Sequence, residues 1–223
     1  MINRLPLWVL VGSVMLALNA GFINSVALLS FANNAVSHVT GTATIAADAL
    51  VDGKVDVFYH TGAIVLSFIV GAILSGMIVG QEALKLGRRY GVALILESTL
   101  LFLAWYAFRQ NLVQAEWLAS AACGLQNAMV ATYSGSVIRT THLTGIVSDI
   151  GSSIGNFFAG RGLAIAKISL QSSIFIAFVI GAGVGSVVFR YAGYDAVLVN
   201  GVWVGMVAMA YWVYLIWAAR SKF

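Results

Sequence analysis

Long apolar segments, separated by short polar turns, run through almost the whole chain. A helix that crosses a lipid bilayer needs about 20 apolar residues, and six segments come close to that length. They are approximately Leu5–Phe31, Val57–Val79, Gly91–Phe108, Glu116–Val137, Ser172–Tyr191 and Ala196–Ala219. The pattern predicts an all-α integral membrane protein with six transmembrane helices.

Two shorter stretches, Val39–Leu50 and Thr144–Ala159, remain between these segments. Both are rich in small and hydroxyl residues and are too short or too polar to span a bilayer comfortably. We expect each to form an interrupted or re-entrant short helix, or a short helix lying in the membrane interface. The hydrophobic pattern alone does not decide whether these two stretches are re-entrant or span the membrane.

Composition supports a membrane protein. Of the 223 residues 61% are hydrophobic and only 9% are charged, whereas a soluble domain has about 25% charged residues. Glycine is abundant (23) and proline nearly absent (1), and small-x-x-x-small patterns such as Gly71-x-x-x-Ser75 and Gly181-x-x-x-Gly185 predict closely packed helices. The single cysteine, Cys123, is expected to be a small packing residue. Nothing in the sequence predicts a metal site or a cofactor.

A short motif occurs twice. Ser37-His38-Val39-Thr40-Gly41 is matched by Thr141-His142-Leu143-Thr144-Gly145, and an asparagine precedes each histidine, Asn24 by 14 residues and Asn127 by 15. Phe68–Ala72 in the second span likewise matches Phe178–Ala182 in the fifth. The single membrane domain, residues 1–223, therefore divides into two copies of one unit, about 5–108 and about 116–219.

Each copy holds three predicted spans. Because three is odd, the second copy must enter the membrane from the opposite face, which makes an inverted-topology repeat. Such repeats recur in secondary transporters, where the binding site lies near the midplane between the halves.

Basic residues set the predicted orientation, since lysine and arginine prefer the cytoplasmic side. With both termini cytoplasmic, eight basic residues face the cytoplasm: Arg4, Lys85, Arg88, Arg89, Arg161, Lys167, Arg220 and Lys222. Three face outward: Lys54, Arg109 and Arg190. This bias favours six spans with the N- and C-termini inside the cell.

Polar side chains within the apolar segments are the candidate binding residues, because polar groups at membrane depth usually face a protein interior or a cavity. The predicted substrate-binding set is His38, Thr40, Gly41, His142, Thr144, Gly145, Asn24, Asn127 and Gln126. A half-helix after each histidine would point its N–H groups at the same place, which favours an anion. The alternative is that each histidine only caps a helix break.

Charged residues at membrane depth form a second set, Glu97, Asp149 and Arg139. Arg139 could pair with Glu97 or with Asp149, or it could attract an anion. Either carboxylate could carry a proton. Asn200 is a further polar candidate within the sixth span. His60, before the second span, is expected to be an ordinary interfacial histidine.

These motifs resemble the YoaK-type family of bacterial inner-membrane proteins, a family defined by a domain of unknown function with six predicted spans. The residues that carry the resemblance are Gly21, Asn24, His38, Thr40, Gly41, Gly124, Gln126, Asn127, Thr141, His142, Thr144 and Gly145. The resemblance covers nearly the whole chain. It implies a multi-pass plasma-membrane protein and a transport role, with no defined substrate.

The sequence favours a secondary transporter or facilitator of a small solute, with an anion among the candidates. The alternatives are a channel-like pore and a membrane signalling or assembly protein without transport. An intramembrane enzyme has the least support, because no nucleophile-elbow or metal-ligand spacing is present. The expected partners are membrane lipid and a small-molecule or ion substrate, but not nucleic acid. The oligomeric state is open, a homo-oligomer included.

Overall fold

The fold is all-helical, as predicted. The computed structural model describes residues 7–30, 34–80, 87–134 and 138–220, and the regular elements in these ranges are α-helices. They are α1 (Leu7–Leu28), α2 (Val39–Val51), α3 (Val55–Val79), α4 (Arg88–Arg109), α5 (Gln114–Tyr133), α6 (Leu143–Phe158), α7 (Ile165–Ala192) and α8 (Asp195–Arg220). The two short stretches predicted after the histidine motifs correspond to α2 and α6.

Within the described residues, five helices are long and apolar enough to cross a membrane, namely α1, α3, α4, α7 and α8. They indicate a membrane protein. The predicted span Glu116–Val137 corresponds to α5, in which alanine, serine, glycine and amide side chains dilute the apolar pattern. Its expected last residues, 135–137, lie outside the described ranges. The count of six spans therefore stays a prediction.

Helix α7 begins at Ile165, seven residues before the predicted start at Ser172. The extra turns contain Lys167 and Gln171, which weaken the apolar pattern on which the prediction depended. Both side chains contact Asp149 of α6, so polar contacts with α6 accompany this part of the helix. Arg4, Lys85 and Lys222, which entered the charge count, lie outside the described residues.

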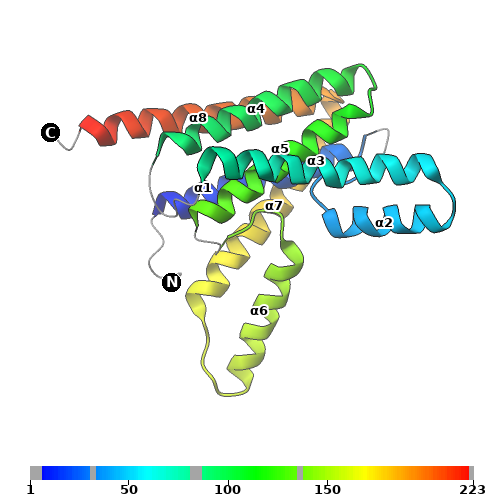
Figure 1. Cartoon of the computed structure of the whole chain (residues 1–223). Coiled ribbons are helices and arrows are strands. Elements are labelled where there is room, and N and C mark those ends of the chain that lie inside the picture. Colours follow the sequence, from blue (N-terminus) through cyan, green and yellow to red (C-terminus); the bar gives the residue numbers. More distant parts are fainter. Residues whose placement is uncertain (1–6, 31–33, 81–86, 135–137, 221–223) are drawn as a thin grey trace.

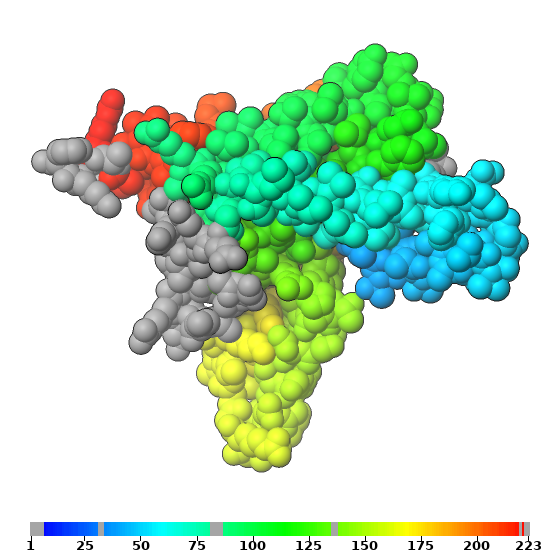
Figure 2. Space-filling view, in the orientation of Figure 1, coloured from blue at the N-terminus to red at the C-terminus, as the bar shows by residue number. Residues whose placement is uncertain are grey.

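Helices pair mostly between the two halves of the chain (Figure 1). Helix α1 packs against α7, α3 against α5, and α4 lies beside α8. Within each half, the short helix folds back on the next long one, α2 on α3 and α6 on α7. Figure 2 shows these two hairpins as separate projections from the body of the protein. Most of α5 is buried among its neighbours.

Glycines allow two very close helix crossings, as the small-residue patterns predicted. Where α3 crosses α5, a Cβ atom on Gly71 would lie 2.7 Å from the Ala121 carbonyl carbon, and one on Gly124 would lie 2.8 Å from that of Phe68. Backbones can approach this closely only because the side chain is absent at both glycines.

The crossing of α1 with α7 repeats this geometry. A Cβ atom on Gly181 would lie 2.7 Å from the Leu18 carbonyl carbon, and one on Gly21 would lie 2.8 Å from that of Phe178. In each crossing the glycine that stands three residues before an asparagine, Gly21 or Gly124, meets the phenylalanine of a Phe-x-x-Gly segment, Phe178 or Phe68. The sequence repeat is therefore accompanied by two crossings with corresponding contacts.

Candidate functional site

A buried polar network lies where α1, α4, α5 and α8 meet. Its side chains are Asn19, Glu97, Gln126, Thr140 and Asn200, each at most 2% exposed. Asn19 of α1 is the central member. Its Nδ2 donates to Glu97 Oε1 at 3.0 Å and to Gln126 Oε1 at 2.8 Å, and its Oδ1 accepts a hydrogen bond from Asn200 Nδ2 at 2.8 Å.

Gln126 extends the network to the segment before α6. Its Nε2 donates to the Leu16 carbonyl at 2.8 Å and to Thr140 Oγ1 at 3.1 Å. Three of the candidates from the sequence, Glu97, Gln126 and Asn200, are therefore brought together. Asn19 and Thr140 join them without having been singled out.

Two oxygens in this network have no hydrogen-bond partner among the described residues, Glu97 Oε2 and Asn200 Oδ1. Both are buried. Leaving a buried polar atom unpaired costs about 1–3 kcal/mol, and more when it is charged. The network is therefore a candidate site, because ionisable groups buried in helical membrane proteins usually pair or line a cavity.

The two histidine motifs have nearly the same local structure. His38 and His142 stand at the N-cap positions of α2 and α6, with (φ, ψ) of (−96°, 62°) and (−89°, 57°). Neither side chain makes a hydrogen bond that caps its helix, so the alternative that each histidine serves as a helix cap is not supported. Both histidines are exposed.

The glycine three residues after each histidine makes room for its ring. A Cβ atom on Gly41 would lie 2.8 Å from Cε1 of His38, and one on Gly145 would lie 2.5 Å from Cε1 of His142. Each imidazole therefore rests on the first turn of its own helix. The threonines of the motifs, Thr40 and Thr144, are exposed on those same turns.

The two asparagines that precede the motifs differ in their contacts. Asn24 Oδ1 accepts hydrogen bonds from Ser37 N at 3.0 Å and from Ser37 Oγ at 2.9 Å, which ties the first motif to α1. Asn127 Oδ1 is buried and has no partner among the described residues, and Thr141 is the residue that corresponds to Ser37. Asn24 is thus hydrogen-bonded to Ser37 in the first half, whereas the equivalent bond from Thr141 to Asn127 Oδ1 is not made in the second.

A polar cleft lies beside the second motif, between α6 and α7. Its volume is about 420 Å³, and it is lined by Arg139, His142, Gly145, Ile146, Ser148, Asp149 and Gln171. Four residues predicted from the sequence therefore meet here: Arg139, His142, Gly145 and Asp149.

Asp149 is anchored across this cleft to α7. Its Oδ2 accepts a hydrogen bond from Gln171 Nε2 at 2.7 Å and lies 3.2 Å from Lys167 Nζ. The hydrogen bond from Gln171 and the contact with Lys167 lower the pKa of the Asp149 carboxyl below its ordinary value. The sequence predicted that Arg139 pairs with Asp149 or with Glu97. In the structure Asp149 contacts Gln171 and Lys167 instead, and Glu97 accepts a hydrogen bond from Asn19.

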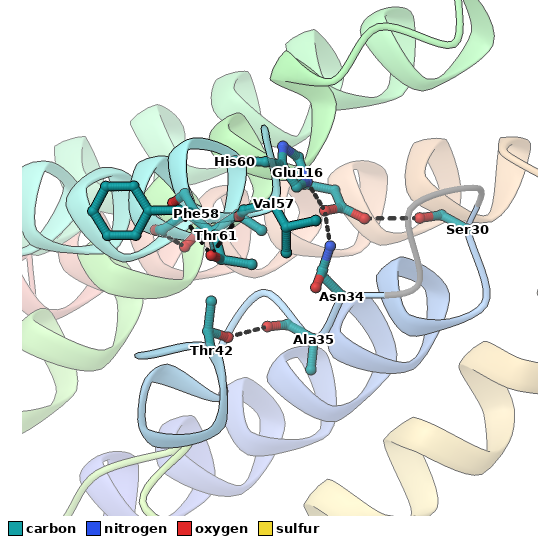
Figure 3. Close-up of polar contacts among 11 residues, drawn as sticks. Ser30, Asn34, Ala35, Thr42, Val57, Phe58, His60, Thr61 and Glu116 are labelled. Carbon is teal, nitrogen blue, oxygen red and sulfur yellow. Dashed lines mark hydrogen bonds and ion pairs between the residues drawn. The ribbon is translucent and has the colours of Figure 1, made fainter. Parts of the chain in front are cut away.

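Glu116 forms a second buried site at the start of α5 (Figure 3). Its carboxylate is fully buried and meets three groups. Ser30 Oγ donates to Oε1 at 3.0 Å, Asn34 Nδ2 donates to Oε2 at 3.2 Å, and His60 Nε2 lies 2.9 Å from Oε2. This site joins α3, α5 and the segment between α1 and α2.

Sequence reasoning did not find the partnership of Glu116 with His60. His60 is more than an interfacial histidine, since its side chain is only 19% exposed and is paired with a buried carboxylate. The sequence held one signal for this contact: Glu116 begins one apolar segment and His60 lies near the beginning of another. Asn19 offered a similar signal, an amide in the middle of the first span.

A family model with the description "Protein of unknown function (DUF1275)" matches residues 12–210. The matched residues include both histidine motifs and the buried network, and the match confirms the resemblance to the YoaK-type family. No curated protein and no solved structure matches the chain.

Proposed function

The chain belongs to the DUF1275 family, and from its geometry we propose that it is a secondary transporter or facilitator for a small solute. The proposed membrane is the bacterial plasma membrane, with both termini in the cytoplasm. The solute binds between two inverted repeats, α1–α4 and α5–α8. Small anions are the first class to test, because Arg139 and His142 line the cleft beside the N-terminus of α6.

The corresponding crossings of α1 with α7 and of α5 with α3 support the inverted repeat. In an inverted repeat the equivalent helices run in opposite directions through the bilayer, so the two short helices α2 and α6 belong to opposite membrane surfaces. With cytoplasmic termini, α2 lies on the outer side and α6 on the inner side.

The difference between Asn24 and Asn127 is the observation that carries the proposal. Asn24 holds Ser37, and Glu116 holds Ser30 and Asn34, so the outer motif is fastened to the bundle. Asn127 has no such bond, and a cleft lies beside the inner motif.

Two equivalent halves in two different states are what alternating access requires, because exchanging the two conformations opens the opposite side. In the exchanged state Asn127 binds Thr141 and Asn24 releases Ser37. The conformation described here is then the inward-facing one.

Two matched cysteine pairs test this exchange. One variant carries Asn24→Cys with Ser37→Cys, and the other carries Asn127→Cys with Thr141→Cys, both combined with Cys123→Ala. The expected result is that a short thiol cross-linker reacts with either pair and abolishes solute uptake into proteoliposomes. In each single-cysteine variant, the cross-linker leaves uptake at the level that the same variant shows before treatment.

Uptake is measured with a panel of labelled small carboxylates, inorganic phosphate and sulfate, with a neutral sugar and an amine for comparison. A carrier gives saturable uptake and counterflow for at least one of these solutes. Full uptake in both cross-linked variants would contradict alternating access, and unsaturable flux would indicate a channel instead.

A further inference from the structure

The carboxyl group of Glu97 is buried in the centre of the bundle without a positively charged partner among the described residues. It is 1% exposed, and the ion pairs with lysine or arginine described here involve other acidic residues, namely Asp52, Asp149 and Asp195. A charge in this position is costly unless something neutralises it. Glu116, which is also fully buried, meets His60, Ser30 and Asn34, so the two sites differ.

Counting donors shows what the Glu97 network lacks. Asn19 Nδ2 uses its two hydrogens on Glu97 and Gln126, and Gln126 Nε2 uses its two on Leu16 and Thr140. Asn200 Nδ2 donates to Asn19. The oxygens Glu97 Oε2 and Asn200 Oδ1 remain unpaired. The network therefore has one negative charge and two free acceptors.

Reversing the amide groups does not remove this shortage. If Asn19 were turned over, its oxygen would face the oxygens of Glu97 and Gln126, and its nitrogen would face the Asn200 nitrogen. If Asn200 alone were turned over, its oxygen would face the Asn19 oxygen. The described orientation is the one with the most hydrogen bonds, and it still leaves two acceptors.

We propose that Glu97 and Asn200 bind one small monovalent cation, a proton or Na⁺, within this network. Either ion neutralises the carboxylate and occupies oxygen lone pairs that have no donor. The two free oxygens are few for a metal ion, which favours the proton. The binding itself is independent of transport, and only the role of coupling ion rests on the proposed function.

A small cavity lies about one helical turn from this site. It has a volume of about 60 Å³ and is lined by Trp8, Gly12, Leu16, Tyr90, Leu94, Met129, Tyr133, Val207 and Tyr211. Leu16 supplies the carbonyl that binds Gln126, and Leu94 and Met129 lie one helical turn from Glu97 and Gln126. The volume suffices for water, and the Tyr133 hydroxyl lies 3.4 Å from Ser13 Oγ on the same side.

Among the ionisable side chains described around this network, Glu97 is the proposed proton-binding group. The titratable groups that act on it electrostatically from α5 are the thiol of Cys123 and the phenol of Tyr133. Tyr90, on α4 itself, stacks edge-on against Tyr133. Helices α1 and α8 contribute the neutral amides of Asn19 and Asn200. Thiols and phenols are uncharged in neutral solution, so a proton bound within this group of neighbours belongs to Glu97.

Infrared spectroscopy of the purified full-length protein in detergent tests the proposal, with H⁺ and Na⁺ as the probes. Wild type should show the carbonyl stretch of a buried, protonated carboxyl group, which decreases as pH rises. Glu97→Gln should lack this band, and the matched variant Glu116→Gln should keep it. Asn200→Ala should shift the midpoint by about one pH unit, a tenfold change in proton affinity.

Thermal unfolding at constant ionic strength supplies the second arm and a check on folding. If the ion is Na⁺, then Na⁺ but not K⁺ raises the unfolding temperature of wild type, and Glu97→Gln abolishes the effect. If the ion is a proton, Na⁺ and K⁺ are equivalent and the infrared band is present. Should Glu97→Gln not fold, Asn200→Ala supplies the test instead, through a shifted midpoint of the infrared band or a weakened response to Na⁺.

The proposal is overturned if wild type has neither the band nor a Na⁺ response. It is also overturned if the band is present but unchanged in Glu97→Gln. A facilitator that needs no coupling ion would fail this test and still pass the uptake test, so the two failures can be told apart.

Discussion

Replacing Gly71 with alanine should force α3 and α5 apart. The new Cβ atom would overlap the Ala121 carbonyl oxygen and lie 2.7 Å from its carbon. Non-bonded carbon atoms need about 3.5–4.0 Å, so the helices would have to separate by roughly 1 Å. Overpacking of this kind costs about 1–3 kcal/mol, while alanine recovers up to about 1 kcal/mol through its higher helix propensity.

The net loss should be about 1–2 kcal/mol for Gly71→Ala, and the same for Gly181→Ala at the corresponding crossing. Two controls lie in the same helices, since a Cβ atom on Gly76 of α3 or Gly183 of α7 meets nothing within 4 Å. In a chain of this size 1 kcal/mol corresponds to about 2–4 °C. The unfolding temperature in detergent should therefore fall by about 2–8 °C in Gly71→Ala and Gly181→Ala, and not in the two controls. Equal unfolding temperatures for Gly71→Ala and Gly76→Ala would refute the close crossing.

Two further predictions concern the polar contacts of Glu116 and Asp149. His60→Ala should lower the free energy of unfolding by about 1–3 kcal/mol, because buried Glu116 loses a hydrogen-bond partner. His60→Gln should recover most of this loss. Coincident denaturation curves for the two variants would contradict the pairing of His60 with Glu116. The pKa of Asp149 is lowered from its ordinary value of 3.8. The contacts of Asp149 therefore stabilise the folded protein above pH 3.8, and this stabilisation is lost as the pH falls below that value. The protection factors of the α6 amides, which are exchange rates corrected for the intrinsic effect of pH, should fall over that range in wild type and stay constant in Asp149→Asn. The effect should be at most about 1 kcal/mol because the group is half exposed.

The hydrophobic pattern was sufficient to predict the individual helices. Apolar length predicted the long ones, and the small, hydroxyl-rich stretches after the histidine motifs predicted α2 and α6 to within one residue at each end. The glycine patterns also predicted close packing correctly, because an absent side chain acts locally. The largest error in a helix boundary, at the start of α7, arose where Lys167 and Gln171 interrupt the apolar pattern to contact Asp149.

Partnerships between distant segments were less accessible. Nothing local to Glu97 indicates that its neighbour is Asn19, 78 residues away, and the expected arginine partner was a guess from charge alone. His60 and Glu116 are separated by 56 residues, and each has an ordinary explanation when considered singly. Such pairs depend on which helices cross, and the crossings exchange helices between the two halves of the chain.

The inverted arrangement of the two halves is the central claim, and the sidedness of α2 and α6 tests it most directly. Val51 and Phe158 are the last residues of these helices and are 87% and 81% exposed. Single cysteines at these positions, Val51→Cys and Phe158→Cys in a Cys123→Ala background, can be labelled in intact cells with a thiol reagent that does not cross membranes. The account predicts that the cysteine at 51 reacts from outside and that the one at 158 reacts only after the cells are opened. Labelling of both from the same side would contradict it.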